Sequence, residues 1–581
     1  MLLPLSLAVR KEKPMVQYGA LLAIALAAYF LYSILNSLKA ARRRREEAEA
    51  NFGKYREHPQ EDFSSLRERW AAGVRNPSFE VDDITWNDLE MDTVYHRINA
   101  CLTTPGEEAL YARLRSLPGG EAGWEDALAA LDNNPALRQK IQALLVQLGK
   151  DSENGLPELM RTPDDYRLPF PWLIRIAALL PLAALSMFFL PLPPGAGFVA
   201  LVPALLASFS VHYWGEKRLQ GRLHTLRYAK ALFWCAKRLG RLDMPGLAVW
   251  QTALREAYLP FARLRRALSG AVQDGMAMGD IGSLMTFVQF FFLSDLRAYN
   301  KVTSLLRKHA KELRALYDAV GMMDVLICTL SFRKSLPLFC LPAFHPQAAL
   351  HVSDAAHPLL EKGIGNSADF TKGVLITGSN ASGKSTFLKA LAVNAILAQA
   401  IHTCSAASFS LPRARVISSM ALRDNLAGGE SYFVVEVKSF RRILQAVRQV
   451  PCLCFVDEIL RGTNTVERIA ASAAVLNSLQ QGNSLCVAAT HDIELASILG
   501  GSYDNYHFQE ELKDKAVSFD YKLRPGPSRT RNALRLLQAY DFPAEVVSEA
   551  LAMVDTFEQE HRWPAPDARK GGDLPAPAEA G

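Results

Sequence analysis

The chain has 581 residues, long enough for several domains, and 65 Lys and Arg against 59 Asp and Glu give a net charge of +6. Charge this close to balance indicates no particular partner by itself. The eight cysteines are scattered and lack the spacing of zinc ligands, which excludes a zinc module or a disulfide framework and is typical of a reduced, cytosolic chain.

An uncharged apolar run lies near the N-terminus. It extends from Pro14 to Leu38, is flanked by Lys13 and Lys39, and is followed by a basic cluster at 42–45. About 20 apolar residues span a bilayer, so we predict a transmembrane helix over 14–38. A signal peptide is the alternative, but the run is too long for one, and its only A-x-A triplets, at 23–27, lie in mid-run.

A second apolar block follows the charged and helical region predicted over 39–170. It runs from Ile176 to Gly215, has only His212 as a possible charge, and is broken by PLPPGAG at 191–197. Two helices around such a turn predict a transmembrane hairpin over 171–215. The alternative is a buried helical hairpin of a soluble core.

Basic residues lie at both ends of this block, and its turn is uncharged. They are Arg161, Arg167 and Arg175 before the block and Lys217, Arg218 and Arg222 after it. The positive-inside rule then places both hairpin ends in the cytoplasm and the N-terminus outside, against which only Arg10, Lys11 and Lys13 argue. We therefore expect a multi-pass protein of the inner or plasma membrane, with 39–170 and 216–581 on the cytoplasmic side.

Residues 216–345 have helical periodicity and basic faces, so we predict a helical core or lever region there. The segment at 217–242 is the clearest case and includes Arg218, Arg222, Arg227 and Lys230. A basic helical face is usually solvated, and next to a membrane it meets either anionic lipid or DNA.

The stretch GVLITGSNASGKST at 373–386 predicts a phosphate-binding loop. An apolar strand at 374–376 precedes the pattern G-x-x-x-x-G-K-S, and a helical segment at 387–399 follows it. Backbone N–H groups of such a loop and the helix N-terminus cradle phosphate oxygens. Lys384 is predicted to reach the β- and γ-phosphates of ATP, and Ser385 to ligate Mg²⁺. The predicted binding residues are Gly378, Ser379, Asn380, Ala381, Ser382, Gly383, Lys384, Ser385 and Thr386.

Two further apolar strands end in polar residues. The strand at 453–456 ends in Asp457 and Glu458, and the strand at 485–489 is followed by Thr490 and His491. Carboxyl ends of parallel strands beside a phosphate loop are where the groups for Mg²⁺ and catalysis lie. We predict Asp457 as a Mg²⁺ ligand, Glu458 as the residue that polarises the attacking water, and His491 as the γ-phosphate sensor.

The segment LAGGESYF at 426–433 opens another predicted helix and resembles the signature segment of ABC-type ATPases. Such a segment caps the γ-phosphate of the opposite subunit through a serine, here Ser431, and a helix N-terminus. It works only across a dimer, so the resemblance implies a homodimer formed through the ATPase domains.

Together these motifs resemble the ATPase domain of the MutS family of DNA mismatch-repair proteins. The resemblance is carried by TGSNASGKST, NLAGGESYFVVE, DEILRGTNT and ATHD, and it extends to AAHPLL at 355–360 and FDYKLRPGPSRTRNALRLL at 519–537. A weaker match at 85–118 resembles the start of the helical core domain of the family. The resemblance implies nucleotide, Mg²⁺ and catalytic roles for the residues above, catalytic ones for Lys384, Glu458 and His491, and a stacking contact of Tyr521 with adenine.

The predicted fold class is an α/β P-loop ATPase domain of ABC type at 346–560, preceded by an α-helical core with transmembrane helices; 561–581 is predicted to be a disordered tail. The family's Phe-x-Glu mismatch reader has no counterpart in the N-terminal region. The predicted function is ATP-dependent binding of double-stranded DNA by a membrane-anchored dimer in the bilayer. The alternative is a mechanochemical membrane ATPase that acts on protein or lipid and binds no DNA.

Overall fold

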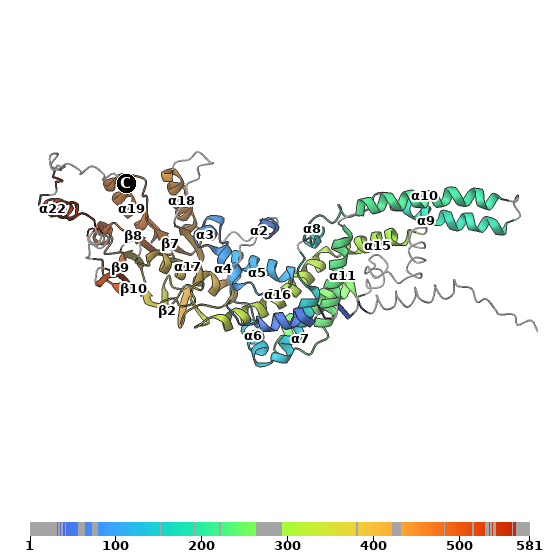
Figure 1. Cartoon of the computed structure of the whole chain (residues 1–581), viewed down its shortest axis with the longest axis horizontal. Helices are drawn as coiled ribbons and strands as arrows, with labels where there is room; N and C mark the ends of the chain where they lie inside the picture. Colours follow the sequence, from blue (N-terminus) through green and yellow to red (C-terminus); the bar gives the residue numbers. More distant parts are fainter. Residues whose placement is uncertain are drawn as a thin grey trace, which may run out of the picture. The chain divides into compact units, whose positions relative to one another are not determined.

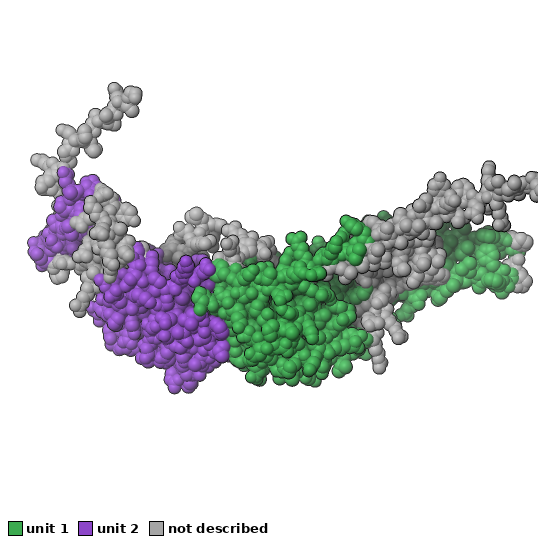
Figure 2. Space-filling view, turned by 60° about the horizontal axis from the view of Figure 1, so that its bottom comes forward, with its two compact units in different colours: residues 1–75, 92–337 green, residues 76–91, 338–581 purple. Residues whose placement is uncertain are grey.

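The structure is a computed structural model. It describes residues 42–55, 64–71, 79–262, 293–420, 432–513, 516–528 and 542–564, with short gaps at 152, 191–192, 194, 220–221, 379–381, 481–482 and 561, and isolated positions at 32–40 and 534–537. The chain forms two compact units. The helical unit comprises 1–75 and 92–337, and the α/β unit comprises 76–91 and 338–581 (Figures 1 and 2). The transmembrane helix predicted at 14–38 and the tail predicted at 561–581 lie almost entirely outside the described residues.

Helices make up the described part of the helical unit. They are α2 (Ser64–Ala71), α4 (Met91–Ile98), α5 (Thr104–Ser116), α6 (Trp124–Asn133), α7 (Pro135–Leu148), α8 (Leu156–Arg161), α9 (Pro171–Ser186), η1 (Met187–Phe189), α10 (Ala196–Leu219), α11 (Arg222–Leu239), α12 (Ala248–Tyr258), η2 (Leu259–Phe261), α15 (Ser294–Lys308) and α16 (Ala310–Ser335). Several start with the expected signals; for example, α5 has Thr103 as its N-cap and Pro105 in its first turn.

The long helix α16 forms the centre of this unit. It packs against α5, α6 and α12, and its residues from Met323 to Arg333 are all buried. Among the described residues, three helical stretches are long and apolar enough to cross a membrane: Pro171–Phe189, Ala196–Leu219 and Ala310–Ser335. The third is 78% buried inside the protein, against 28% and 17% for the other two. The apolar character of α16 is therefore explained by the core of the helical unit.

The helices α9 and α10 form an antiparallel hairpin, seen at one end of the unit in Figure 1. Ser208 Oγ of α10 donates a hydrogen bond of 2.9 Å to the Ala177 carbonyl of α9, and Phe188 and Phe198 meet edge to face near the turn. The outward face carries exposed apolar side chains, with Phe189 90% exposed. The sequence placed the hairpin at 171–215; in the structure α10 continues to Leu219.

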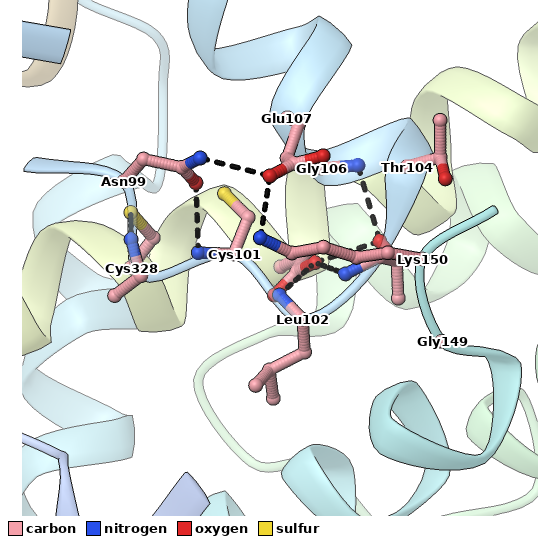
Figure 3. A network of polar contacts seen from close by, with 12 residues as sticks. Asn99, Cys101, Leu102, Thr104, Gly106, Glu107, Gly149, Lys150 and Cys328 are labelled. Carbon is pink, nitrogen blue, oxygen red and sulfur yellow. Dashed lines mark hydrogen bonds and ion pairs between the residues drawn. The ribbon is translucent and has the colours of Figure 1, made fainter. Parts of the chain in front are cut away.

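A buried polar network fixes the start of α5 on α16 (Figure 3). Asp324 of α16 is 0% exposed and accepts hydrogen bonds from Leu102 N, Thr103 N and Thr103 Oγ1. Thr103 Oγ1 in turn accepts the Gly106 N–H at the first turn of α5. Lys150 and Glu107 form an ion pair at the edge of the network. Burial raises the pKa of Asp324 to about 6, although the hydrogen bonds and the Lys150 charge oppose the rise.

The α/β unit contains two sheets. The strands are β1 (Pro342–His345), β2 (Leu350–Ala355), β3 (Asn366–Phe370), β4 (Gly373–Thr377), β5 (Ser408–Pro412), β6 (Arg415–Ser419), β7 (Cys452–Asp457), β8 (Leu485–Thr490), β9 (Tyr503–Lys513) and β10 (Ala516–Pro525). The larger sheet has the order β10-β9-β4-β8-β7-β6 and the smaller one the order β1-β5-β2-β3. From β9 to β6 all pairings in the larger sheet are parallel. The carboxyl ends of β4, β7 and β8 therefore lie at one edge.

Helices cover the larger sheet: α17 (Lys384–Ile401), α18 (Tyr432–Val447), α19 (Thr465–Leu479) and α20 (Ile493–Ile498); α22 (Ala544–Glu560) follows β10 in the chain. On one side Phe440 of α18, Leu476 of α19 and Leu495 of α20 share a core with Leu375 and Cys454. The helix α17 also packs on the strands of this sheet and is buried along most of its length. The structure thus contains the strand–loop–helix order that the sequence predicts around the glycine loop.

The N-terminal residues of the α/β unit form a strap, residues 82–90, that includes α3 (Asp83–Asp88). Asp88 accepts hydrogen bonds from Ser418 Oγ and Met420 N at the end of β6, at 2.7 and 2.9 Å. Asp82 forms ion pairs with Arg442 of α18 and Arg415 of β6. The sequence assigned this segment to the helical region; in the structure it belongs to the compact α/β unit.

Candidate nucleotide-binding site

The glycine loop lies between β4 and α17. Gly378 and Gly383 both have positive φ, +142° and +102°, and a Cβ at Gly378 would lie 2.9 Å from the Phe508 carbonyl oxygen, so both positions favour glycine. The Gly383 carbonyl accepts the Phe387 N–H at 2.9 Å and begins the helix. Ser379, Asn380, Ala381 and Ser431 lie outside the described residues.

Lys384 is buried in the first turn of α17, and its side chain points back along the loop. Its Nζ donates to the Gly378 carbonyl at 2.6 Å and lies 3.4 Å from His491 Nε2. Ser382 is buried, Ser385 is half-buried and Thr386 is exposed. The structure therefore brings the lysine from β4–α17 and the histidine from the end of β8 into one cluster, although they are 107 residues apart.

Asp457 is the last residue of β7, and its environment fits a divalent cation. Its Oδ1 is buried and accepts no hydrogen bond from any described residue. A buried carboxylate oxygen without a protein donor is the chemistry that Mg²⁺ requires, since this ion takes oxygen ligands, keeps several waters and uses substrate phosphates. No group of three or more His, Cys, Asp or Glu side chains among the described residues could hold a metal ion. Asp457 and Ser385 would thus hold Mg²⁺ together with phosphate oxygens.

Glu458 lies one residue further, and its carboxylate contacts the side chains of His491 and Arg461. Its Oε1 is 3.0 Å from His491 Nε2, and its other oxygen pairs with Arg461 Nε. The Glu458 N–H donates to the Ala489 carbonyl of β8 at 2.9 Å. Burial would raise the pKa of Glu458, but the His491 hydrogen bond and the charges of Arg461, His491 and Lys384 outweigh it, so the pKa is lowered. The carboxylate is therefore ionised at neutral pH and accepts hydrogen bonds.

Tyr521 lies beside the glycine loop. A Cβ at Gly383 would lie 3.0 Å from Cδ1 of the Tyr521 ring, and the ring, 43% exposed, stacks on Phe519. The residue has a φ of +53° where the β9–β10 register shifts. Asn366 of β3 holds this bulge, because it donates to the Tyr521 carbonyl and accepts the Leu523 N–H. An exposed aromatic ring next to the phosphate loop is placed for stacking on a base.

Sequence reasoning missed two residues of this site. Arg461, three residues after Glu458, binds the Glu458 carboxylate, and the buried Glu436 of α18 accepts the Arg461 N–H at 3.3 Å. Arg461 lies in the motif DEILRGTNT and Glu436 is the last residue of the motif NLAGGESYFVVE, but the sequence assigned no role to either residue. The contact between them crosses from one helix to a loop 25 residues away.

A glycine loop between a buried parallel strand and a helix, with carboxylates and a histidine at the ends of the neighbouring strands, defines the C-terminal unit as a P-loop ATPase-type domain. Residues 374–558 match the family model described as MutS domain V. This part of the chain is thus similar to domain V of the MutS family, in agreement with the motif resemblance.

Three known proteins are similar over the same part of the chain. The MutS protein homolog 4 of Mus musculus is 32% identical over 271 residues, 43% of this chain and 28% of that protein. The DNA mismatch repair proteins MutS of two strains of Thermus thermophilus are each 28% identical over 258 residues, 43% of this chain and 31% of those proteins. The similarity thus covers less than a third of the length of each relative.

Proposed function

We propose that the chain is a membrane-anchored ATPase that binds double-stranded DNA and whose dimer opens and closes with ATP hydrolysis. The observation that carries the ATPase part is the cluster of Lys384, Glu458 and His491 at the carboxyl ends of β4, β7 and β8. These groups come from three elements of the sheet and point at one place next to the phosphate loop.

Each residue of the cluster has a distinct part in the proposed reaction. Lys384 neutralises charge on the β- and γ-phosphates, and the N-terminus of α17 faces the same anion. Asp457 and Ser385 would hold Mg²⁺, which would supply positive charge next to the phosphate oxygens. Glu458, ionised and oriented by His491, accepts a hydrogen bond from the attacking water and polarises it. His491 is also near enough to Lys384 to contact the γ-phosphate.

Dimerisation through the ATPase domains belongs to the same proposal. It rests on the resemblance of 426–433 to an ABC-type signature segment, in which Ser431 would contact the γ-phosphate held by the partner. Two composite sites per dimer then close on ATP and open after hydrolysis, and the helical units transmit the change.

Membrane anchoring is supported by the hairpin of α9 and α10. Its apolar side chains, among them Leu179, Phe189 and Val199, are exposed, as lipid-facing residues would be. Ser208 turns its hydroxyl inward to a backbone carbonyl, which is how polar groups are satisfied between helices in lipid. Lys217 and Arg218 in the last turn of α10 fit the cytoplasmic end of a span.

For the DNA-binding part of the proposal there is an alternative function. Of the four cationic residues expected on the lever helices, Arg218 and Arg227 are exposed and Arg222 and Lys230 are half-buried. Arg218 lies over the Trp214 ring and Arg222 over the Tyr166 ring, each at 5.5 Å. Fewer free cations on this face favour the alternative, a mechanochemical membrane ATPase that acts on protein or lipid. The MutS relatives, two of which are described as DNA mismatch repair proteins, favour DNA.

Two measurements on the detergent-solubilised protein test the proposal. Glu458→Gln should keep Mg²⁺ and ATP binding and lower turnover by about 10² or more, the usual contribution of a general base, whereas Lys384→Ala should weaken nucleotide binding. Wild-type turnover in Glu458→Gln would rule out the assigned base.

For DNA, matched and mismatched duplexes should bind alike, because no Phe-x-Glu reader was identified. The affinity for DNA should fall as the salt concentration rises. The logarithm of the binding constant should decrease with the logarithm of the salt concentration with a slope of about −0.9 per phosphate neutralised. Absence of binding to either duplex at low salt, with and without ATP, would select the membrane ATPase alternative.

A further inference from the structure

The loop that carries the catalytic carboxylate is backbone-strained. Glu458 and Leu460 both lie in the left-handed region, with φ of +57° and +55°, although neither is a glycine. Residues in such conformations cost on the order of 1–3 kcal/mol each and persist only where surrounding contacts hold them. The position of the Glu458 side chain therefore depends on what holds residues 458–462.

The helix α18 supplies one of these contacts through Glu436. Its side chain is 2% exposed, and its Oε1 accepts the Arg461 N–H at 3.3 Å. Burial raises the pKa of Glu436, while backbone hydrogen bonds from Arg461, Gly462 and Leu460 oppose the rise. A buried carboxyl group is costly unless it accepts hydrogen bonds, so the bond from the Arg461 N–H ties it to the loop.

The same helix packs against the loop with no space between them. A Cβ at Gly462 would lie 2.8 Å from the Cβ of Phe433, the second residue of α18. On the other side, Ser472 Oγ of α19 donates to the Ile459 carbonyl at 3.3 Å, and the Glu458 N–H is held by β8. The loop is thus clamped between α18, α19 and β8.

The clamped backbone determines where the Arg461 guanidinium lies. Arg461 is 43% exposed at its side chain, and an ion pair this open is worth little by itself. Because Glu436 fixes its backbone N–H, the guanidinium stays at one oxygen of Glu458 and leaves the other oxygen to His491. Both carboxylate oxygens are thereby oriented.

We propose that Glu436 is a positioning residue for hydrolysis: it anchors the 460–462 backbone, and through Arg461 it sets the orientation of the Glu458 carboxylate. The inference rests on the proposed ATPase function of Glu458. It makes α18 part of the catalytic apparatus of its own chain, in addition to the contact proposed for Ser431 with the partner.

The test measures kcat and the KM for ATP of the full-length protein. Glu436→Ala should lower kcat about 10-fold, because a small displacement of a catalytic group has effects of this size or more, and should change the KM for ATP less than about twofold. Glu436→Gln keeps an acceptor oxygen and should recover most of the turnover.

Two further variants separate positioning from general destabilisation. Ser439→Ala removes a buried hydrogen bond from the same helix, to Ser419 at 3.1 Å, and should lower Tm while kcat stays within about twofold of the wild type. Arg461→Ala should fold normally and lower kcat with little change in the KM for ATP, as Glu436→Ala does, so it tests the relay even if Glu436→Ala does not fold.

A kcat within about twofold of the wild type in both Glu436→Ala and Arg461→Ala, or the same loss of kcat in Ser439→Ala, would overturn the inference. Glu458→Gln distinguishes this failure from that of the proposed function. Loss of turnover in Glu458→Gln together with normal kcat in Glu436→Ala removes only the positioning role. Normal turnover in Glu458→Gln removes the catalytic assignment on which it rests.

Discussion

Replacing Asp324 by Asn should change how the stability of the helical unit depends on pH. Asp324 is fully buried in α16, and its pKa is raised from 3.8 to about 6, chiefly by burial. The folded state therefore binds this proton more tightly than the unfolded state. Stability contributed by the group is highest below about pH 4, falls as pH rises toward 6, and is level above that.

The size of this change in stability follows from the difference between the pKa of Asp324 in the folded state and its ordinary value of 3.8. Each unit is worth about 1.4 kcal/mol, so the whole change is at most ~3 kcal/mol, and between pH 7 and pH 5 it is about 1 kcal/mol. An asparagine cannot ionise but keeps an acceptor oxygen for Leu102 N and Thr103 N. The free energy of unfolding of the wild type, relative to Asp324→Asn, should therefore rise by about 1 kcal/mol from pH 7 to pH 5.

Urea unfolding of the detergent-solubilised chain at pH 5, 6 and 7 measures this difference. Asp132→Asn, on α6 of the same unit, is the matched control that subtracts the effect of removing one negative charge. A wild-type minus Asp324→Asn difference that stays constant, or that grows toward pH 7, would refute the reasoning, because it would mean that burial does not raise this pKa.

Three further predictions concern the membrane, the dimer and the strap. The protein should remain in the membrane pellet after high-salt and alkaline washing, because α9 and α10 expose apolar faces; release into the supernatant would exclude a spanning hairpin. Subunits with Ser431→Ala and Lys384→Ala, each inactive alone, should regain one working site when mixed, whereas dimers that form without recovery would show that each site is complete within one chain. Arg442→Ala should destabilise the α/β unit by about 1–3 kcal/mol in thermal or urea unfolding, because Asp82 loses one of its two arginine partners and the Ser418 carbonyl loses its Arg442 donor. Arg441→Ala, exposed on the same helix, should have little effect, and equal losses in both variants would contradict a role for the strap.

The local parts of the site were predictable because local patterns encode them. The apolar runs before Gly378, Asp457 and His491 predicted parallel strands, and the structure has β4, β7 and β8 there. Parallel pairing then brings their carboxyl ends together, so Lys384, Glu458 and His491 meet although they are far apart in the chain.

The rest depends on tertiary packing that no local pattern encodes. Whether α16 crosses a membrane or fills a core is decided by what surrounds it, and 78% of its apolar window is buried inside the protein. The contact of Glu436 with Arg461 requires α18 to pack on the catalytic loop. The approach of the Tyr521 ring to Gly383 requires a β-bulge at which Tyr521 itself has a positive φ. A tyrosine in the sequence does not indicate such a backbone conformation.

The strap has a consequence for the order of folding. Asp88 is synthesised 332 residues before Met420, whose N–H it accepts. This contact of the α/β unit therefore cannot form until most of the chain has been synthesised. Contacts this distant in sequence form late, because the loop between them must be closed first. A C-terminal fragment that begins at residue 338 would leave Arg442 and Arg415 without their Asp82 partner. A fragment that keeps these contacts would have to join residues 76–91 to 338–581.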